Sequence, residues 1–402
     1  MNDAPTSRLV HLIRRPMEIV FLRYVVLVVV AAPIVMWILW LFQPCRPLHC
    51  VIVDKSSLDE TGHEHTSLTW VLDHDKYVSS QGYFFRPGED YYGFHGHADN
   101  TFTINDLDGL SDSGRAELAR TADLAYFAES YGVYERDWYH VSRSPPRLIY
   151  GGLSDGDLDF MRRMDEAGKL VIAEFSFLSP PTTRKRREAV EALYHLHSTG
   201  WTGRFFESLD TLKSGELPYW VTLLYQRQHP GEWPFQGAGI VLVNPRGEIV
   251  ILDSQRHLKT PVPVILTTED YQETFKLPAW IPYPFWFDIT FPADTSSQAI
   301  SMFHLPVNAA GDSLLQAHHI PENFPAVILH GDHPLRFVYL CGDFSDNPVP
   351  PSAAFFRGIH WFQTFFHNPR VLSDRRGFFW EFYLPLISHL VRGALDQASG
   401  SS

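Results

Sequence analysis

The chain has 402 residues, of which 45% are hydrophobic and 20% are charged, a composition typical of a globular protein with a core of ample size. Its formal net charge of −13 excludes the extended basic face that binding to nucleic-acid phosphates requires. We therefore expect no nucleic-acid partner.

The first predicted element is a membrane-spanning helix at residues 24–42. This run carries no charged side chain and approaches the roughly 20 residues that a spanning helix needs. Four arginines against two acids in residues 1–23 predict a cytoplasmic N-terminus, by the positive-inside rule. A cleaved signal peptide is the alternative, but the run exceeds the usual ~7–15 residues and no A-x-A-like site follows. We expect a single-pass anchor in the cell membrane, with the globular part outside the cytoplasm.

Beyond residue 50, short apolar runs alternate with helical patterns. The runs at 51–53, 124–128 and 170–173 predict strands that are buried on both faces. Between them lie helical segments, one of which begins at Ser154, a plausible N-cap. This alternation predicts an α/β fold, with a doubly wound and mostly parallel sheet.

The pattern changes near residue 233, where β runs and prolines dominate. The segment "AGIVLVNPRGEIVILDS" predicts a hairpin around Asn-Pro-Arg-Gly. Short apolar strands return at 324–329 and 337–341. We predict three parts: an α/β domain at 48–232, an inserted antiparallel β segment at 233–320, and the last strands of the α/β domain with C-terminal helices at 321–396. The alternative is that the inserted segment is a separate second domain.

Each of the first apolar strands ends in an acid, namely Asp54, Glu129 and Glu174. Because ligands bind outside the carboxyl ends of parallel strands, we expect these side chains to cluster with Asp343 at one edge. Crowded carboxylates raise one another's pKa, which suits general acid and base catalysis. Glu174, Glu129 and Asp54 are thus the candidate catalytic residues, and the alternative is that each caps its strand on loop amides.

Candidate ligand-binding residues surround these strand ends. A guanidinium at Arg204, in an aromatic segment, could hold a carboxylate. Aromatic rings beside acids suit sugars, whose C–H faces stack on rings while their hydroxyls bond to acids; core packing is the alternative. The candidates are Arg204, Asp343, Tyr131, Trp286, Tyr92 and His65.

Histidines and cysteines leave two further alternatives open. Two pairs of loop histidines, His63/His65 and His95/His97, could reach one metal together with Asp54 or Glu64. Polar loop histidines without a metal are the simpler interpretation. We predict neither a metal nor a cofactor. Cys45 and Cys50 flank a short stretch outside the predicted membrane, where either a disulfide or two free thiols is possible.

The C-terminal segment 375–395 carries apolar side chains at three- and four-residue steps. It could lie on the membrane surface or close the fold by packing on the sheet, and we expect the second. The stripe comprises Phe378, Phe379, Phe382, Leu386, His389 and Leu390.

Motifs for several chemistries are missing from the sequence. It has no G-x-x-x-x-G-K-[ST] loop and no G-x-G-x-x-G after a strand. Nucleotide binding therefore lacks support, and no cysteine lies on a predicted strand-to-helix turn.

At "ADLAYFAESYGVY", "GKLVIAEFSFLSPPT" and "GWTGRFFESLD" the chain resembles a group of bacterial membrane-anchored proteins. Their soluble part is similar to the class I glutamine amidotransferase-like (GATase-like, flavodoxin-like) fold, and the likeness covers most of residues 50–390. Active amidotransferases of that fold carry a cysteine in a G-x-C-x-G elbow, which this sequence lacks. The resemblance thus implies the fold without glutamine hydrolysis. It also implies a binding or accessory module for an envelope polysaccharide or its synthesis machinery; a carboxylate-dependent glycan hydrolase or lyase is the alternative.

Overall fold

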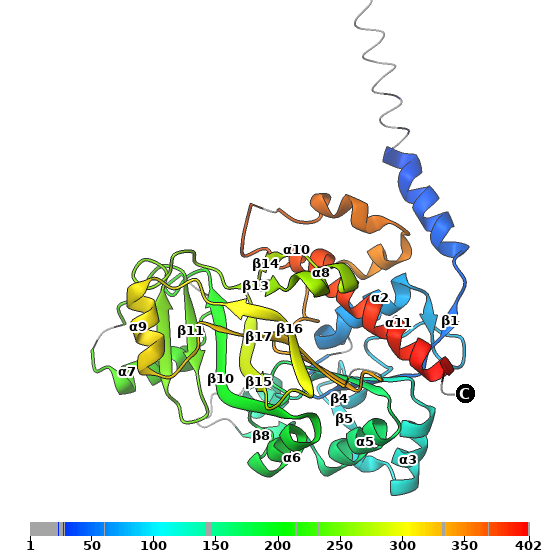
Figure 1. The fold of residues 1–402 in the computed structure, drawn as a ribbon, viewed down its shortest axis with the longest axis horizontal. Helices are drawn as coiled ribbons and strands as arrows, with labels where there is room; N and C mark the ends of the chain where they lie inside the picture. The colour runs from blue at the N-terminus through cyan, green and yellow to red at the C-terminus, as the bar shows by residue number, and fades with distance from the viewer. Residues whose placement is uncertain are drawn as a thin grey trace, which may run out of the picture.

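The computed structural model describes residues 29–397 except 60, 141–146, 214, 232, 332–333 and 369, together with Arg23, Leu27 and the backbone of 398–400. Its largest element is a ten-stranded sheet, which lies beside the part of the molecule that holds β11 (Gly239–Val243), α7 (Tyr219–Gln228) and α9 (Ala309–Ala317) (Figure 1). In spatial order the strands are β14 (Trp280–Pro282), β13 (Val264–Thr267), β16 (Ser297–His304), β17 (Asn323–His330), β18 (Phe337–Leu340), β9 (Leu170–Glu174), β6 (Leu124–Glu129), β2 (Cys50–Asp54), β4 (Tyr92–Gly96) and β5 (Phe102–Asn105).

The centre of this sheet is parallel and its flanks are antiparallel. β18, β9, β6, β2 and β4 run in one direction, whereas β5 and the strands from β17 outward alternate. The central strands are fully buried apart from the end of β6 and two positions of β4, as their apolar sequences predict. The returning strand β18 pairs with β9, so the last part of the chain completes the parallel core.

A second, four-stranded antiparallel sheet stands beside the first. Its order is β12 (Ile249–Asp253), β11 (Gly239–Val243), β10 (Leu196–Phe206) and β15 (Trp286–Pro292). The predicted hairpin is β11–β12, and the Asn244 side chain accepts a hydrogen bond from the backbone of Arg246 in its turn. Two-stranded pairs are formed by β1 (Arg46–Pro47) with β3 (Tyr77–Val78) and by β7 (Val133–Tyr134) with β8 (Leu148–Tyr150).

Helices lie on both sides of the central sheet, with α3, α5 and α6 on one side and α2, α8 and α11 on the other (Figure 1). Ser154 is the N-cap of α5, as predicted, and exchanges hydrogen bonds with Asp157 in a capping box. The helices are α2 (Thr66–His74), α3 (Asp112–Thr121), α4 (Glu135–Tyr139), α5 (Asp155–Glu166), α6 (Arg184–Tyr194), α7 (Tyr219–Gln228), α8 (Glu269–Phe275), α9 (Ala309–Ala317), α10 (Arg376–Phe378) and α11 (Leu384–Gly400), with shorter turns η1 (His63–His65), η2 (Leu107–Gly109), η3 (Pro351–Phe355), η4 (Ile359–Phe365) and η5 (Phe379–Tyr383).

The C-terminal segment closes the fold. The aromatic residues of η5 and the apolar residues of α11 up to Ala394 are buried in the main core, and Tyr383 Oη lies 2.9 Å from Tyr126 Oη of β6. Of the six residues in the predicted C-terminal stripe, His389 is exposed and the other five are buried.

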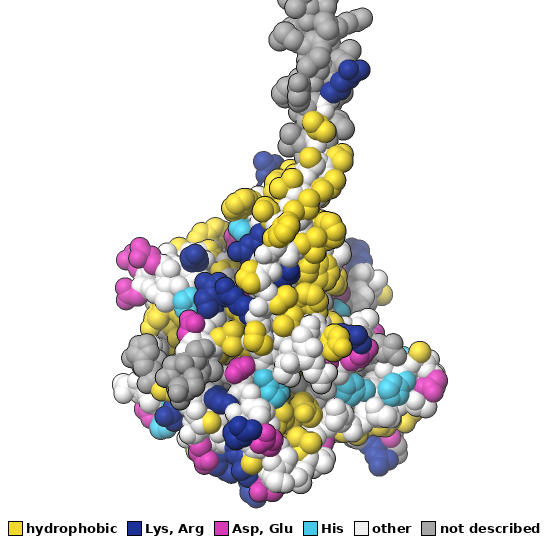
Figure 2. Space-filling model, turned by 90° about the vertical axis from the view of Figure 1, so that its right-hand side faces the viewer, with side chains coloured by type: hydrophobic (Ala, Val, Ile, Leu, Met, Phe, Trp, Pro, Cys, Tyr) yellow, Lys and Arg dark blue, Asp and Glu magenta, His cyan; other side chains and the backbone are white. Residues whose placement is uncertain are grey.

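Residues 29–41 form a helix that projects from the globular part (Figure 1). Its side chains are mostly apolar and exposed, and they cover it on the face shown in Figure 2. None of the described helices is both long and apolar enough to cross a membrane. Residues 24–26 and 28 of the predicted span lie outside the described residues, so the span remains a prediction.

Candidate functional site

The four acid-bearing strand ends meet at one edge of the parallel core. β18, β9, β6 and β2 are consecutive parallel neighbours, so Asp54, Glu129 and Glu174 end adjacent strands. Asp343 follows β18 after two further residues. These acids nevertheless have different partners, and only some of them are open to a ligand.

Asp54 is fully buried and bonded on both carboxylate oxygens. Oδ1 accepts from the backbone amides of Ser56 and Ser57 at 2.9 and 3.1 Å, and Oδ2 accepts from Ser57 Oγ at 2.7 Å. His65 Nδ1 lies 2.7 Å from Oδ2, and its Nε2 lies 2.8 Å from the carbonyl of Pro87. Burial alone would raise the pKa of Asp54, but the bonds and charge of His65, with those of Ser57 and Ser56, lower it. Asp54 and His65 therefore form an internal support that faces no ligand.

Glu174 holds the loop that follows β18. Its Oε2 accepts from the backbone amides of Phe344 and Ser345 at 3.0 and 3.1 Å and from Ser345 Oγ at 3.1 Å. Its Oε1 accepts from the hydroxyl of Tyr126. Burial raises the pKa of Glu174 to about 8 against the opposing effect of these donors. The side chain fixes the position of the loop that carries Asp343.

Glu129 and Asp343, which the sequence places at the same edge, lie together with Glu64, which the sequence suggests only as a partner of the loop histidines. Carboxylate oxygens of Glu64, Glu129 and Asp343, here called the carboxylate cluster, lie within 4.8 Å of one another. Burial raises the pKa of Glu129 to about 7, with a further contribution from the charge of Asp54. Burial and neighbouring acids likewise hold the pKa of Glu64 and Asp343 well above their usual range. Carboxyl groups this close to one another favour a proton held between them over adjacent negative charges.

The cluster can therefore do two things chemically. It can retain protons near neutral pH and exchange them with a ligand, or it can surrender them and bind one cation through three oxygens. Both possibilities depend on the same three side chains.

Ser176 supports Glu129 from the loop after β9. Its backbone has φ of 67°, a left-handed conformation that costs a non-glycine residue about 1–3 kcal/mol. The side chain is buried, and Oγ donates to Glu129 Oε1 at 2.7 Å. The unusual backbone thus coincides with a contact to the cluster.

Arginines and aromatic rings form a wall next to the cluster. The guanidinium of Arg204 lies 4.9 and 5.4 Å from the ring centroids of Phe285 and Trp286, and its Nη2 bonds to Glu216 at 3.3 Å. Arg375 stacks on Phe285 and donates to Asp346 at 3.1 Å. The wall continues from the cluster because the amide of Asp343 donates to the carbonyl of Trp286.

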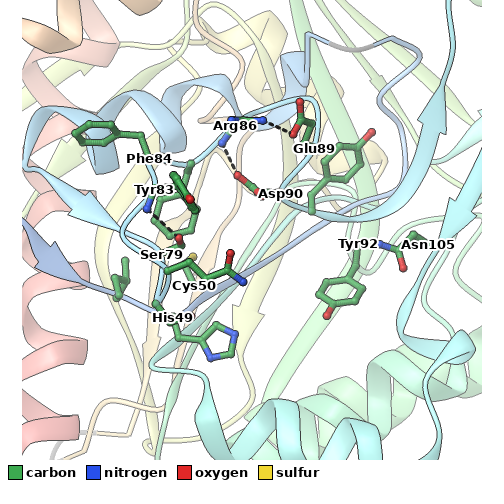
Figure 3. Close-up of a pocket in the computed structure, with 15 residues that line it drawn as sticks. His49, Cys50, Ser79, Tyr83, Phe84, Arg86, Glu89, Asp90, Tyr92 and Asn105 are labelled. Carbon is green, nitrogen blue, oxygen red and sulfur yellow. Dashed lines mark hydrogen bonds and ion pairs between the residues drawn. The ribbon is translucent and has the colours of Figure 1, made fainter.

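The two remaining predicted ligand residues, Tyr92 and Tyr131, lie outside the wall. Tyr92 lines a separate cavity of about 600 Å³, which Asn105, His49 and the acids Glu89 and Asp90 also line (Figure 3). Successive side chains of a strand point to opposite sides, and β4 pairs Gly93, not Tyr92, with Asp54. Tyr131 lies two residues beyond β6 and is 39% exposed, with its ring 5.1 Å from that of Tyr134. Burial raises the pKa of Tyr131 and the charge of Glu129 adds to this, so Tyr131 lies at the border of the cluster.

Three cysteines are free thiols, with Cys45 exposed and Cys50 and Cys341 buried. The alternative of two unpaired thiols at Cys45 and Cys50 is therefore the one observed. Burial raises the pKa of Cys341 well above its usual range, so its thiolate is disfavoured.

Fold and site together define an α/β protein with an acidic site at the carboxyl edge of a parallel core, an arrangement compatible with a flavodoxin-like fold. No protein-family model matches the chain, and no curated protein is similar to it in sequence. Among solved structures the chain is similar to a ThuA-like protein from Bacteroides uniformis ATCC 8492, with a TM-score of 0.36 and 10% identity over 84% of this chain and 92% of that one. This TM-score is below the range of chains that share a topology, so the fold class follows from the strand order alone.

Proposed function

We propose that this protein is a membrane-anchored, extracytoplasmic module that binds an envelope glycan at the carboxyl edge of its sheet. The observation that carries the proposal is the carboxylate cluster standing beside the arginine and aromatic wall. Hydroxyl-rich rings bind where carboxylates accept their O–H groups and flat aromatic faces stack on their C–H groups.

The bonding of the strand-end acids supports binding rather than glycoside hydrolysis. Glycosidases use two carboxyl groups that both face the scissile bond. Asp54 and Glu174 are bonded to protein donors and have no free side to offer a substrate.

The cysteine positions support a role other than glutamine hydrolysis. That reaction needs an accessible thiolate at the nucleophile position. Cys341 is the cysteine nearest to the site in sequence, and it is fully buried with a raised pKa.

The projecting helix supports the anchor. Along residues 29–42 the exposed side chains include Val29, Ile34, Leu39 and Phe42, at 65, 53, 54 and 84% exposure. A helix that is apolar all round is stable when other apolar material covers it, and a bilayer supplies this.

Calorimetric titration of the full chain in detergent with polysaccharide fragments from the host envelope tests the glycan site. Glu129→Gln should weaken binding at least about tenfold, a loss of ~1.4 kcal/mol, because an amide alters both charge and proton sharing in the cluster. Glu117→Gln on α3, an exposed site at a distance from the cluster, is the matched control and should bind as the unaltered chain does. Equal affinity in all three proteins would refute the site.

A carboxylate-dependent hydrolase or lyase is the second candidate. It is favoured by Glu129, whose pKa of about 7 suits a general acid or base, and by the hydrogen bond that Ser176 gives it. Release of reducing ends from the same fragments, abolished in Glu129→Gln and retained in Glu117→Gln, would establish this function in place of simple binding.

A further inference from the structure

The turn η4 exposes large aromatic side chains on the surface. Trp361 and Phe365 are 79 and 83% exposed, and Phe362 is 39% exposed. Residues 347–373, which include η4, contain two arginines and no aspartate or glutamate, although the whole chain has a net charge of −13. A contiguous apolar and cationic segment on an acidic protein marks an interaction surface.

Hydrogen bonds and ring contacts attach this segment to the projecting helix. The backbone amide of Arg357 donates to the carbonyl of Met36 at 3.1 Å, and its guanidinium donates to Gln43 Oε1, also at 3.1 Å. The ring of Phe355 packs edge-on against Trp40, with centroids 5.0 Å apart. The segment lies on the side of the globular part from which the helix emerges (Figure 1), and apolar side chains surround the base of the helix (Figure 2).

The position of the contact along the helix sets its depth relative to a bilayer. Met36 precedes the end of the predicted span at residue 42 by six residues, which is about 9 Å of helix at ~1.5 Å per residue. Segments that lie in a membrane interface bury their apolar side chains about 5–10 Å into the boundary between headgroups and acyl chains. A loop bonded to the helix at Met36 would therefore reach the interface whenever the helix spans the bilayer.

We propose that η4 is a second membrane contact, lying in the interface of the bilayer that holds the anchor. Trp361, Phe362 and Phe365 enter the boundary between headgroups and acyl chains, while Arg370 faces anionic headgroups. This inference rests on the anchor of the proposed function. Two attachments orient the globular part, whereas a single helix would leave it free to rotate about the helix axis.

Nitroxide accessibility in the full chain tests the contact. Cys45→Ser removes the exposed thiol and leaves Cys50 and Cys341 buried, so that labels can be placed singly at Phe365→Cys and Trp361→Cys. Ser113→Cys on α3, exposed at the opposite end of the molecule (Figure 1), is the control. In vesicles with anionic lipid, oxygen should relax the labels at 361 and 365 more than a water-soluble nickel chelate does, and the order should reverse at 113.

Three other results would each overturn the inference. If the full chain does not float with the vesicles, the anchor itself fails and the contact fails with it. If the chain floats but the labels at 361 and 365 are accessible to nickel, the anchor stands and the contact is refuted. If these labels are shielded from both reagents and broaden each other between molecules, a second copy of the chain covers η4 instead of lipid.

Discussion

Replacing Glu174 distinguishes a structural acid from a catalytic one. In Glu174→Ala the backbone amides of Phe344 and Ser345 lose their acceptor. The hydroxyl of Ser345 still donates to the carbonyl of Glu64, and the hydroxyl of Tyr126 still bonds to that of Tyr383. Two buried amides left without partners cost about 1–3 kcal/mol each, so we expect a loss of about 2–6 kcal/mol in the free energy of unfolding.

Glu174→Gln is the matched variant and should be far milder. Its amide oxygen can accept from the two backbone amides, and its NH₂ group can donate to the hydroxyl of Tyr126. Because burial raises the pKa of Glu174 to about 8, the carboxyl is mostly protonated at pH 7 and little charge is lost. We expect less than about 1 kcal/mol of destabilisation.

Urea unfolding of the full chain in detergent, followed by tryptophan fluorescence, measures both values. An alanine variant as stable as the unaltered chain, or a glutamine variant as unstable as the alanine variant, would refute this account of Glu174.

Four further predictions concern pH, a buried ion pair, the C-terminus and topology. Burial raises the pKa of the carboxylate cluster, so the folded chain binds more protons than the unfolded chain between about pH 5 and 7. The free energy of unfolding should therefore fall as the pH rises over this window, and fall less steeply in Glu129→Gln. A free energy of unfolding that rises with pH over this window would contradict the prediction. Lys55 pairs with Asp157 in the interior, so Lys55→Met should cost about 3–5 kcal/mol in urea unfolding, and adding Asp157→Asn should recover part of that loss. Truncation at Arg375 removes several buried side chains worth ~1.5–3 kcal/mol each and should give an aggregated chain, whereas a folded monomer in gel filtration would contradict the closing role of α11. Alkaline phosphatase fused after residue 60 should be active, and an inactive fusion would reverse the topology.

The parallel core was predictable because each central strand has its own sequence signature. A short apolar run that ends in an acid specifies a strand buried on both faces and the point where it reaches the sheet edge, as β6 does at Glu129. The common edge then follows from parallel pairing alone.

The partners of each acid could not be predicted, because loops determine them. Glu64 reaches the cluster through η1, although its position between His63 and His65 favours a histidine site in sequence. Arg375 is distant in sequence, and only the folded path of the C-terminal segment brings it to Asp346. Ser176 has one signal, its place two residues beyond a strand that ends in an acid, but its left-handed backbone is not visible in the sequence.

The tyrosines show a different limit. The segment around Tyr92 is a strand, and strand alternation allows only two directions for each side chain. The register of the strand decides which of these two directions points toward the site. Here β4 pairs Gly93 with Asp54, and Tyr92 lines the separate cavity instead.

Hydrogen exchange of the full chain in detergent, with and without an envelope polysaccharide fragment, locates the ligand on the chain and so tests glycan binding at the carboxyl edge. We predict slower exchange in the segments that form the carboxylate cluster and its wall, at residues 62–66, 129–134, 283–287 and 343–347. Protection confined to residues 79–92, around the cavity that Tyr92 lines, or no protection by any fragment of the host envelope, would contradict the assignment of glycan binding to the carboxyl edge.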